Sequence, residues 1–193
     1  MSTFPVEKDI FCKEYESGLY SLLPYYLSKL TIEIPLTAIF PSIFVFLVYF
    51  SVGFTRTSKA FFSFWLMSVL ECLVGLMLGI FFGTIVPSLQ LAIEISPIIF
   101  IPFILFSGFT TNTENILPPM KPIEYVSPMR YTFEFLVRNE FYARDDLKES
   151  HPIETLNFTF QQEFILILMT CYVSILIVAT AFTLKFCSKG VKN

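Results

Sequence analysis

Four apolar runs in this chain are long enough to cross a lipid bilayer as helices. An α-helix rises about 1.5 Å per residue, so about 20 apolar residues cross a hydrocarbon core about 30 Å thick. The runs cover residues 34–55, 60–86, 89–111 and 164–184. Lipid offers the backbone no hydrogen-bond partner, so each run must be helical. The sequence therefore predicts an all-α membrane protein with four transmembrane helices.

The composition agrees with this prediction. Of the 193 residues, 54% are hydrophobic and only 15% are charged, whereas charged residues make up about a quarter of an ordinary soluble domain. The 24 phenylalanines indicate that lipid is the solvent for much of the surface. The formal net charge of −3 is too small to indicate a nucleic-acid partner. We therefore expect membrane lipids among the partners and no nucleic acid.

An even number of spans puts both chain ends on one side of the membrane. Lysines flank the membrane at both ends: Lys8, Lys13, Lys29, Lys185, Lys189 and Lys192. The positive-inside rule then favours cytoplasmic termini, although Arg56 and Lys59 fall on the outer side. Residues 112–163 would form an external loop, which contains Asn157-Phe158-Thr159, a glycosylation sequon.

The second span carries a carboxylate and three glycines at intervals of four residues. They are Glu71, Gly75, Gly79 and Gly83, and they share one stripe of a helix. Because glycines at this spacing let another backbone approach closely, we expect a helix-packing groove here rather than a substrate groove. A carboxylate inside a span normally faces protein or water. Glu71 is thus either a neutral, hydrogen-bonded strut or part of a polar relay beside a translocation path.

The third span is the best candidate to line a pathway. Pro97 and Pro102 each remove a backbone donor and kink the helix, which is tolerated where the helix faces protein or a cavity. Glu94 is a second intramembrane carboxylate near the start of this span. Its phenylalanines recur every third residue, and packing or lipid contact is the default role for most of them: Phe100, Phe103, Phe106 and Phe109.

No catalytic or metal-binding constellation is present in the sequence. The single histidine, His151, excludes a His-based metal site or triad within this chain. The four cysteines lack metal-ligand spacing, and no G-x-x-x-x-G-K-[ST] string cradles a phosphate. We therefore expect no enzyme activity, no metal and no bound cofactor in this chain itself.

A charged segment stands between the third and fourth spans. Ser127 as N-cap and Pro128 at the first helical position predict a helix over residues 128–142. Its charges alternate in sign along one stripe: Arg130, Glu134 and Arg138. Its apolar face comprises Phe133, Leu136, Val137 and Phe141. This helix is too short and too charged to span, so we expect it to pack back against the bundle at the external interface. The alternative is an ordinary solvated surface helix.

Four strings in the chain form the pattern of a known family. They are FCKEYESGLY at 11–20, YYLSK at 25–29 with EIP at 33–35, FSGF at 106–109 with Asn112, and SPMRYTFEFLVRNEF at 127–141. In this order, between spans of the right length, they resemble the C-terminal part of the membrane domain (ABC-2 type) of G-subfamily ABC transporters, the white and pleiotropic-drug-resistance type.

The resemblance implies roles for particular residues. The cytoplasmic segment 1–30 would contact an ATP-binding domain through Glu14, Tyr15, Ser17 and Gly18. The four spans would be the third to sixth membrane helices of the family, and helix 128–142 would belong to an external re-entrant element. The transport pathway and its outer plug would include Phe103, Phe106, Phe109 and Thr110. Thr110 departs from those relatives that have two apolar residues at the plug.

The resemblance also implies a function. We expect an integral multi-pass membrane protein that takes part in ATP-driven export of lipophilic or amphipathic substrates. ATP and Mg²⁺ would bind in a domain that this sequence lacks, as it lacks the first two membrane helices of the family, and a second membrane half would complete a dimer. The alternative is a non-transporting regulatory or packing subunit, or a truncated gene product without independent activity.

Overall fold

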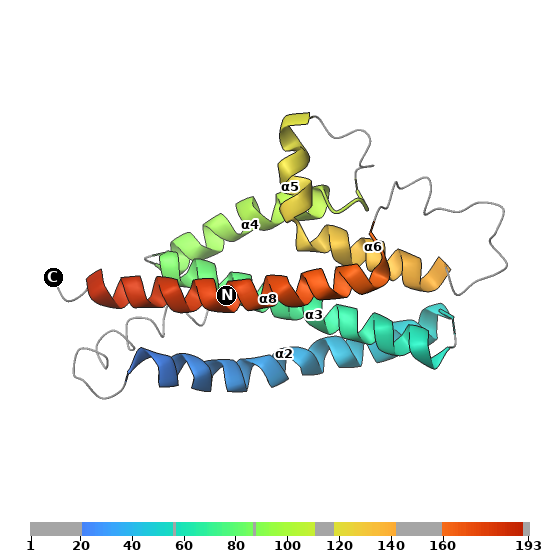
Figure 1. Ribbon diagram of the computed structural model, residues 1–193, viewed down its shortest axis with the longest axis horizontal. Helices are drawn as coiled ribbons and strands as arrows, with labels where there is room; N and C mark the ends of the chain where they lie inside the picture. The colour runs from blue at the N-terminus through green and yellow to red at the C-terminus, as the bar shows by residue number, and fades with distance from the viewer. Residues whose placement is uncertain (1–20, 56, 87, 111–117, 142–159, 191–193) are drawn as a thin grey trace.

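The protein is all-α in the parts that the structure describes. The computed structural model describes residues 21–55, 57–86, 88–110, 118–141 and 160–190. Three long helices lie lengthwise beside one another (Figure 1): α2 over Leu22–Val52, α3 over Ser58–Ile85 and α8 over Gln162–Gly190. Each contains a stretch long and apolar enough to cross a membrane, namely Pro24–Val52, Ser58–Ile85 and Gln162–Lys185.

The fourth apolar helix, α4, is shorter than the sequence predicted. It covers Leu89–Leu105, 17 residues, and not the whole run 89–111. The helix ends because the amide of Ser107 donates to the carbonyl oxygen of Ile104, three residues earlier, in place of the helical acceptor four residues earlier. Gly108 follows with a φ of 85°. This left-handed conformation carries little cost for glycine alone. The FSG string at 106–108 is therefore the stop signal of α4.

Helix α2 begins well before the apolar run 34–55, close to Leu19, where the helical spacing of the residues before the run predicts a start. Its first turns contain polar residues, among them Lys29, whose ammonium lies 3.6 Å from the carboxylate of Glu33. At the other end, Gly53 caps the helix with a φ of 74°, and its amide donates to Tyr49 O. This left-handed glycine cap lets the chain reverse into α3 within a few residues.

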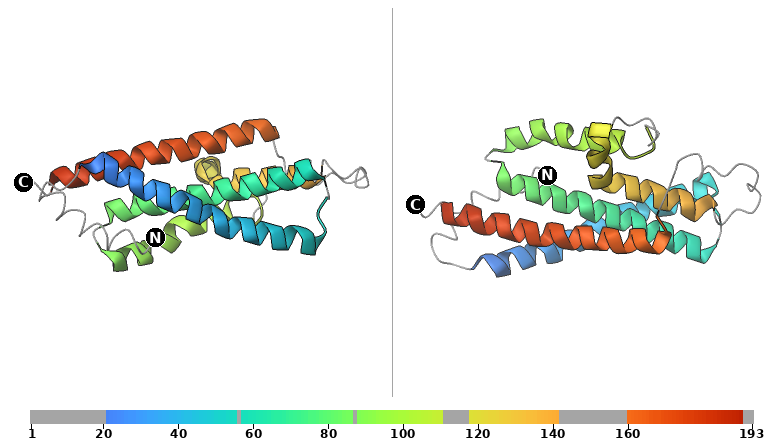
Figure 2. Two further views of the ribbon diagram at one scale, coloured as in Figure 1. Left: turned by 90° about the horizontal axis from the view of Figure 1, so that it is seen from below. Right: turned by 45° about the horizontal axis from the view of Figure 1, so that its top comes forward.

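Between α4 and α8, the described residues form three short elements. They are a 3₁₀ turn over Pro118–Met120, α5 over Lys121–Val126, and α6 over Pro128–Phe141. The sequence predicted the last of these over 128–142. Figures 1 and 2 show α6 beside α3 and α8 near the α2–α3 turn, whereas α4 lies along the opposite half of α3.

Buried apolar side chains form two clusters along α3. The first joins α3, α6 and α8 through Met67, Leu70, Val74, Leu78, Tyr131, Phe135, Ile165 and Met169. The second joins α2, α3 and α8 through Tyr26, Leu30, Met77, Ile80 and Leu184. Side chains of α6 thus complete the first cluster, so the short charged helix is part of the core.

The outer surface is unusually apolar. Large hydrophobic side chains stand exposed along α2, α4 and α8, such as Phe44, Ile98 and Val178, which is 68% exposed. A soluble monomer seldom exposes continuous apolar area of this extent. This surface suits contact with lipid tails, and it agrees with the long apolar helices of an integral membrane protein.

Candidate functional site at helix α6

The charged face of α6 points into the protein. Arg130, Glu134 and Arg138 are 4%, 0% and 8% exposed, whereas the four residues of the apolar face are only half-buried. The stripe is therefore not solvated as in an ordinary surface helix. An apolar face that points outward is favourable where it contacts lipid or another protein. A charge that points inward is tolerated only where hydrogen-bonding or oppositely charged groups surround it.

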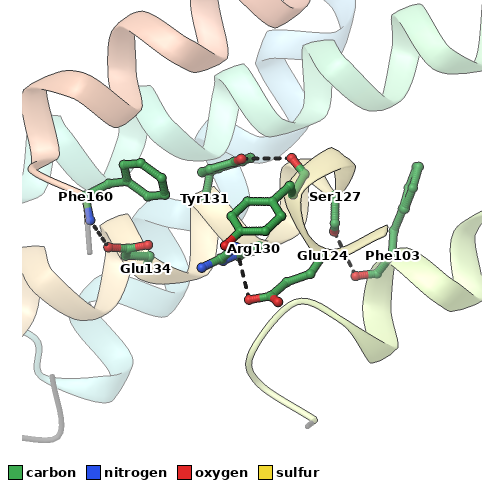
Figure 3. A network of polar contacts seen from close by, with 8 residues as sticks. Phe103, Glu124, Ser127, Arg130, Tyr131, Glu134 and Phe160 are labelled. Carbon is green, nitrogen blue, oxygen red and sulfur yellow. Dashed lines mark hydrogen bonds and ion pairs between the residues drawn. The ribbon is translucent and has the colours of Figure 1, made fainter. Parts of the chain in front are cut away.

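Glu134 joins α6 to the beginning of α8 (Figure 3). Its Oε1 accepts the backbone amide of Phe160 at 2.8 Å. The same oxygen accepts the Nε of Arg138 at 3.3 Å. The Nη2 of Arg138 lies 3.2 Å from the same oxygen. One carboxylate oxygen therefore holds both the next turn of its own helix and the residue that leads into α8.

Burial raises the pKa of Glu134 above the ordinary carboxyl value, because the charged form loses its hydration. The Phe160 amide, Arg138 and Arg130 act in the opposite direction. The second carboxylate oxygen, Oε2, is buried and has no hydrogen-bond partner among the described residues. Glu134 is thus an incompletely compensated group at the centre of the site.

Arg130 pairs with α5 rather than with its own helix. Its Nη1 lies 3.0 Å from Oε1 of Glu124, and both side chains are about 95% buried. The guanidinium carbon also lies 4.9 Å from the centre of the Tyr125 ring, within cation–π range. The neighbouring Tyr131 hydroxyl donates to Tyr125 O at 2.8 Å (Figure 3). These contacts fix α5 against α6.

Ser127 connects α6 to the end of α4. Its Oγ donates to the carbonyl oxygen of Phe103 at 3.0 Å (Figure 3), and Ser127 is fully buried. The Ser107 amide, which would be the helical donor to Phe103 O, bonds Ile104 O instead. The last carbonyls of a helix need such outside partners. Because α4 ends early, the carbonyl of Phe103 has no donor within the helix, and Ser127 supplies one.

Three further contacts bind α6 to α3 and to the α2–α3 turn. Thr132 Oγ1 donates to Oε2 of Glu71 at 2.6 Å, and Asn139 Nδ2 donates to Ala60 O at 2.8 Å. Glu140 accepts the amide of Thr55 at 3.1 Å and its hydroxyl at 3.0 Å. We call the contacts of Ser127, Arg130, Thr132, Glu134, Asn139 and Glu140 the α6 network.

The glycine stripe of α3 divides into two parts. Glu71 lies at one end against Thr132 of α6. Gly79 and Gly83 are buried and border one small cleft together with α4, whose nearest small residues are Ala92 and Ser96. Gly75 lies between these regions, and a methyl group added there would meet nothing within 4 Å. Thus α4 approaches α3 at the two later glycines only.

The remaining candidates are dispersed. Phe103 packs at the edge of the first core cluster, and Phe106 is half-buried. Phe109 is 75% exposed, and its ring lies edge-on to Phe133 with centroids 5.6 Å apart. Thr110 is exposed and donates to Ile104 O at 3.3 Å.

Glu94 is exposed on the first turns of α4 and accepts the side-chain amide of Gln90 at 3.2 Å. Five candidates lie outside the described residues: Glu14, Tyr15, Ser17, Gly18 and Asn157. Within the part of the chain that the structure describes, no group of three or more His, Cys, Asp or Glu side chains could hold a metal ion.

Sequence reasoning missed several residues of the α6 network. Glu124 was not a candidate, because it lies before the predicted beginning of the helix, although its partner Arg130 is near it in the chain. Thr132 and Thr55 were not candidates either, because each meets a partner far away in the chain: 61 residues separate Thr132 from Glu71. No local pattern reports such a pairing. Asn139 and Glu140 belong to the SPMRYTFEFLVRNEF string, but no local pattern assigns them a role. Their place in a family string was the one available signal.

Lipid-facing helices that are joined by a buried polar helix define an integral membrane protein of the all-α class. The model of the ABC-2 type transporter family matches residues 1–141. The chain therefore belongs to the ABC-2 type transporter family, as a part of its membrane domain.

Curated relatives agree with this assignment. ABC transporter G family member 7 of Arabidopsis thaliana is 33% identical over 141 residues, which are 73% of this chain and 19% of the relative. ABC transporter G family member 1 of Dictyostelium discoideum is 34% identical over 73% of this chain and 19% of its own length. The broad substrate specificity ATP-binding cassette transporter ABCG2 of Rattus norvegicus is 35% identical over 74% and 22%. The chain thus spans about a fifth of the length of these relatives.

Proposed function

We propose that this chain forms the C-terminal part of the membrane domain of an ATP-driven exporter of lipophilic or amphipathic substrates. The observation that carries the proposal is the family match over residues 1–141, together with G-family relatives at 33–35% identity. One relative, ABCG2 of Rattus norvegicus, is named for broad substrate specificity, and by analogy the pathway here would not be limited to a single substrate.

The energy for export would come from ATP hydrolysis in a domain outside this sequence, where ATP and Mg²⁺ would bind. The segment with Glu14, Tyr15, Ser17 and Gly18 would couple that domain to α2. A second membrane half would complete the pathway in a dimer. Both termini would be cytoplasmic, so the α2–α3 turn and the end of α6 that contacts it would face outward.

Helix α4 would line the pathway. It contains Pro97 and Pro102, and one of its sides exposes Ile98 and Ile101. The α6 network would hold the outer end of α4 through Ser127, beside the proposed plug residues Phe109 and Thr110. Glu71 would serve as a strut that fastens α6 to α3, because its carboxylate accepts from Thr132. The buried pair Gly79 and Gly83 would serve helix packing.

Vesicle transport tests the proposal. The full chain is assembled with the ATP-binding part of a G-family relative, taken together with the first two membrane helices of that relative, and ATP-dependent accumulation of an amphipathic fluorescent dye is measured in inside-out vesicles. We expect accumulation only when both parts and ATP are present. The ATP-binding part alone is the control. Stable co-purification without dye accumulation would contradict an exporter role and is the result expected of a non-transporting subunit.

A further inference from the structure

A groove with aromatic walls lies at the α2–α3 turn, away from the α6 network. It is bordered by Tyr49, Phe50, Thr57, Ser58, Phe61 and Phe62, and it contains about 530 Å³ of space that is partly open to the surroundings. The groove therefore belongs to the two helices α2 and α3 and to the turn between them.

The floor of the groove is firmly packed. The ring of Tyr49 is buried and lies edge-on to Phe61, with centroids 5.1 Å apart, and edge-on to Phe64 at 5.5 Å. The outer walls are more open: Phe50 and Phe62 are 54% and 61% exposed, and the centroid of each ring lies 5.8 Å and 5.6 Å, respectively, from that of Phe61. Two large rings thus stand over a rigid floor with no protein group between them and the surroundings in the described structure.

One end of the groove is polar. Thr57 and Ser58 contribute exposed hydroxyl-bearing side chains where α3 begins, and Thr57 does not cap the helix through its side chain. Lys59 follows, exposed and without an acidic partner among the described residues. It precedes Phe62 by three residues, so both lie on neighbouring positions of one helix face. Apolar walls thus meet hydroxyls and a positive charge.

The groove lies where two apolar stretches long enough to cross a membrane end, at Val52 and Ser58. If both stretches span a bilayer, the groove lies at the level of a membrane–water interface. A bilayer offers at this level a molecule with the matching chemistry, a phospholipid with an acyl chain beside a headgroup of net negative charge. The positive charges of Lys59 and its neighbour Arg56 run against the positive-inside rule if the turn is external. The positive-inside rule therefore does not explain a lysine at position 59. Binding of a lipid headgroup would explain it.

We propose that this groove binds one anionic phospholipid, with its acyl chain between Phe50 and Phe62 and its phosphate at Lys59 and the hydroxyls of Thr57 and Ser58. The bound lipid would also brace α6. The Tyr49 hydroxyl on the floor donates to Thr55 O, and Thr55 donates to Glu140 of α6. A lipid that packs against Tyr49 would therefore stabilise the α2–α3 turn, to which α6 is hydrogen-bonded through Glu140.

Photolabelling in nanodiscs tests this proposal on the full chain. Phosphatidylglycerol or phosphatidylcholine, each with a diazirine on the upper acyl chain, is present at low fraction in a phosphatidylcholine bilayer. Adducts are mapped by mass spectrometry at residues 46–66, and adducts on the exposed lipid-facing part of α8, around Val178 and Phe182, report bulk lipid. We expect phosphatidylglycerol adducts to be enriched at 46–66 relative to α8, and phosphatidylcholine adducts to be enriched less.

Variants make the test specific. Lys59→Gln should lower the enrichment about fivefold, the effect of one basic residue near a lipid surface, and Lys59→Arg should keep it. Phe44→Ala removes an equally exposed ring of α2 outside the groove and should change nothing. Equal labelling of 46–66 and α8 would overturn the site. Unchanged enrichment in Lys59→Gln, or equal enrichment of both lipids, would overturn recognition of the anionic headgroup.

Discussion

Glu134 has no exposed surface, yet it is a carboxylate that accepts from a backbone amide and a guanidinium. A buried ionisable group is stabilising only when its partners remain, and the loss of one partner leaves the other uncompensated. The same holds for Arg130 with Glu124. At the scale of single residues, we therefore expect the free energy of unfolding to fall when either member of a buried pair is removed, and to change little when an exposed charge nearby is removed.

We predict that Glu134→Ala lowers the free energy of unfolding by about 3–5 kcal/mol, the usual cost of breaking a buried pair. Arg138 and the Phe160 amide would both lose their acceptor. Denaturant titration in detergent measures the change. The matched control, Glu163→Ala, removes an exposed carboxylate from the first turn of α8 and should cost less than about 1 kcal/mol. Similar costs for both variants would contradict the network.

The raised pKa of Glu134 predicts a pH dependence. Because the folded state favours the protonated form, the contribution of Glu134 to stability is complete below the unfolded carboxyl pKa of about 4.3 and is lost as the pH rises through the folded pKa. The melting temperature of the native protein should therefore rise relative to Glu134→Gln as the pH is lowered through this window. A difference between the two proteins that stays constant, or that shrinks towards acid, would contradict the assignment.

Glu71 allows a second comparison at this scale. Glu71→Gln keeps an oxygen that accepts from Thr132 and should fold normally, whereas Glu71→Lys puts a positive charge into this part-buried contact, where Thr132 offers no negative charge, and should abolish assembly. Size-exclusion profiles in detergent report assembly. Glu94→Lys makes the same charge change at an exposed position of α4 and should assemble normally. Normal assembly of Glu71→Lys would show that Glu71 does not take part in the contact between α3 and α6.

At the scale of elements, α3 is the helix on which the others are assembled. Its apolar residues contribute to both core clusters, and its glycine stripe meets α6 at one end and α4 at the other. Because α4 is shorter than a full span, α6 occupies the remaining part of this face. The two short helices thus cover α3 in succession, and Ser127 joins them.

Two glycines of one stripe should respond oppositely. Gly79→Leu should push α4 away from α3 and lower the free energy of unfolding by about 1–3 kcal/mol, the usual cost of overpacking. Gly75→Ala meets open space and should raise it by up to about 1 kcal/mol, since alanine favours the helix over glycine. The same denaturant titration measures both. A stable Gly79→Leu protein would show that α4 does not pack at that glycine.

The elements were largely predictable from the sequence, and the orientation of α6 was not. Apolar runs of about 20 residues predict helices whatever their partners, and Ser127-Pro128 correctly marked the beginning of α6. The early end of α4 was missed because the run stays apolar through Phe106, while the turn depends on Gly108. An amphipathic pattern shows two faces of a helix, but it does not show which one meets lipid.

At the scale of the whole molecule, the short helix α6 contacts the other described helices, or the segments that begin or end them, near one end of the bundle. The α6 network reaches α3, α4, α5, the α2–α3 turn and the beginning of α8. Its residues are those of the SPMRYTFEFLVRNEF string through which the chain resembles G-family transporters. A membrane domain that changes shape needs such a fixed assembly to transmit movement, and our proposed exporter role assigns this task to α6.

The central claim is that α6 turns its polar face into the protein, and cysteine accessibility tests it most directly. In a background without the four native cysteines, the small replacements Ser127→Cys and Thr132→Cys are compared with Gln161→Cys and Thr110→Cys at exposed positions, using a membrane-impermeant maleimide on nanodiscs. Labelling at 127 and 132 should be at least about tenfold slower, because it requires local opening. Equal rates at all four positions would contradict the inward polar face of α6.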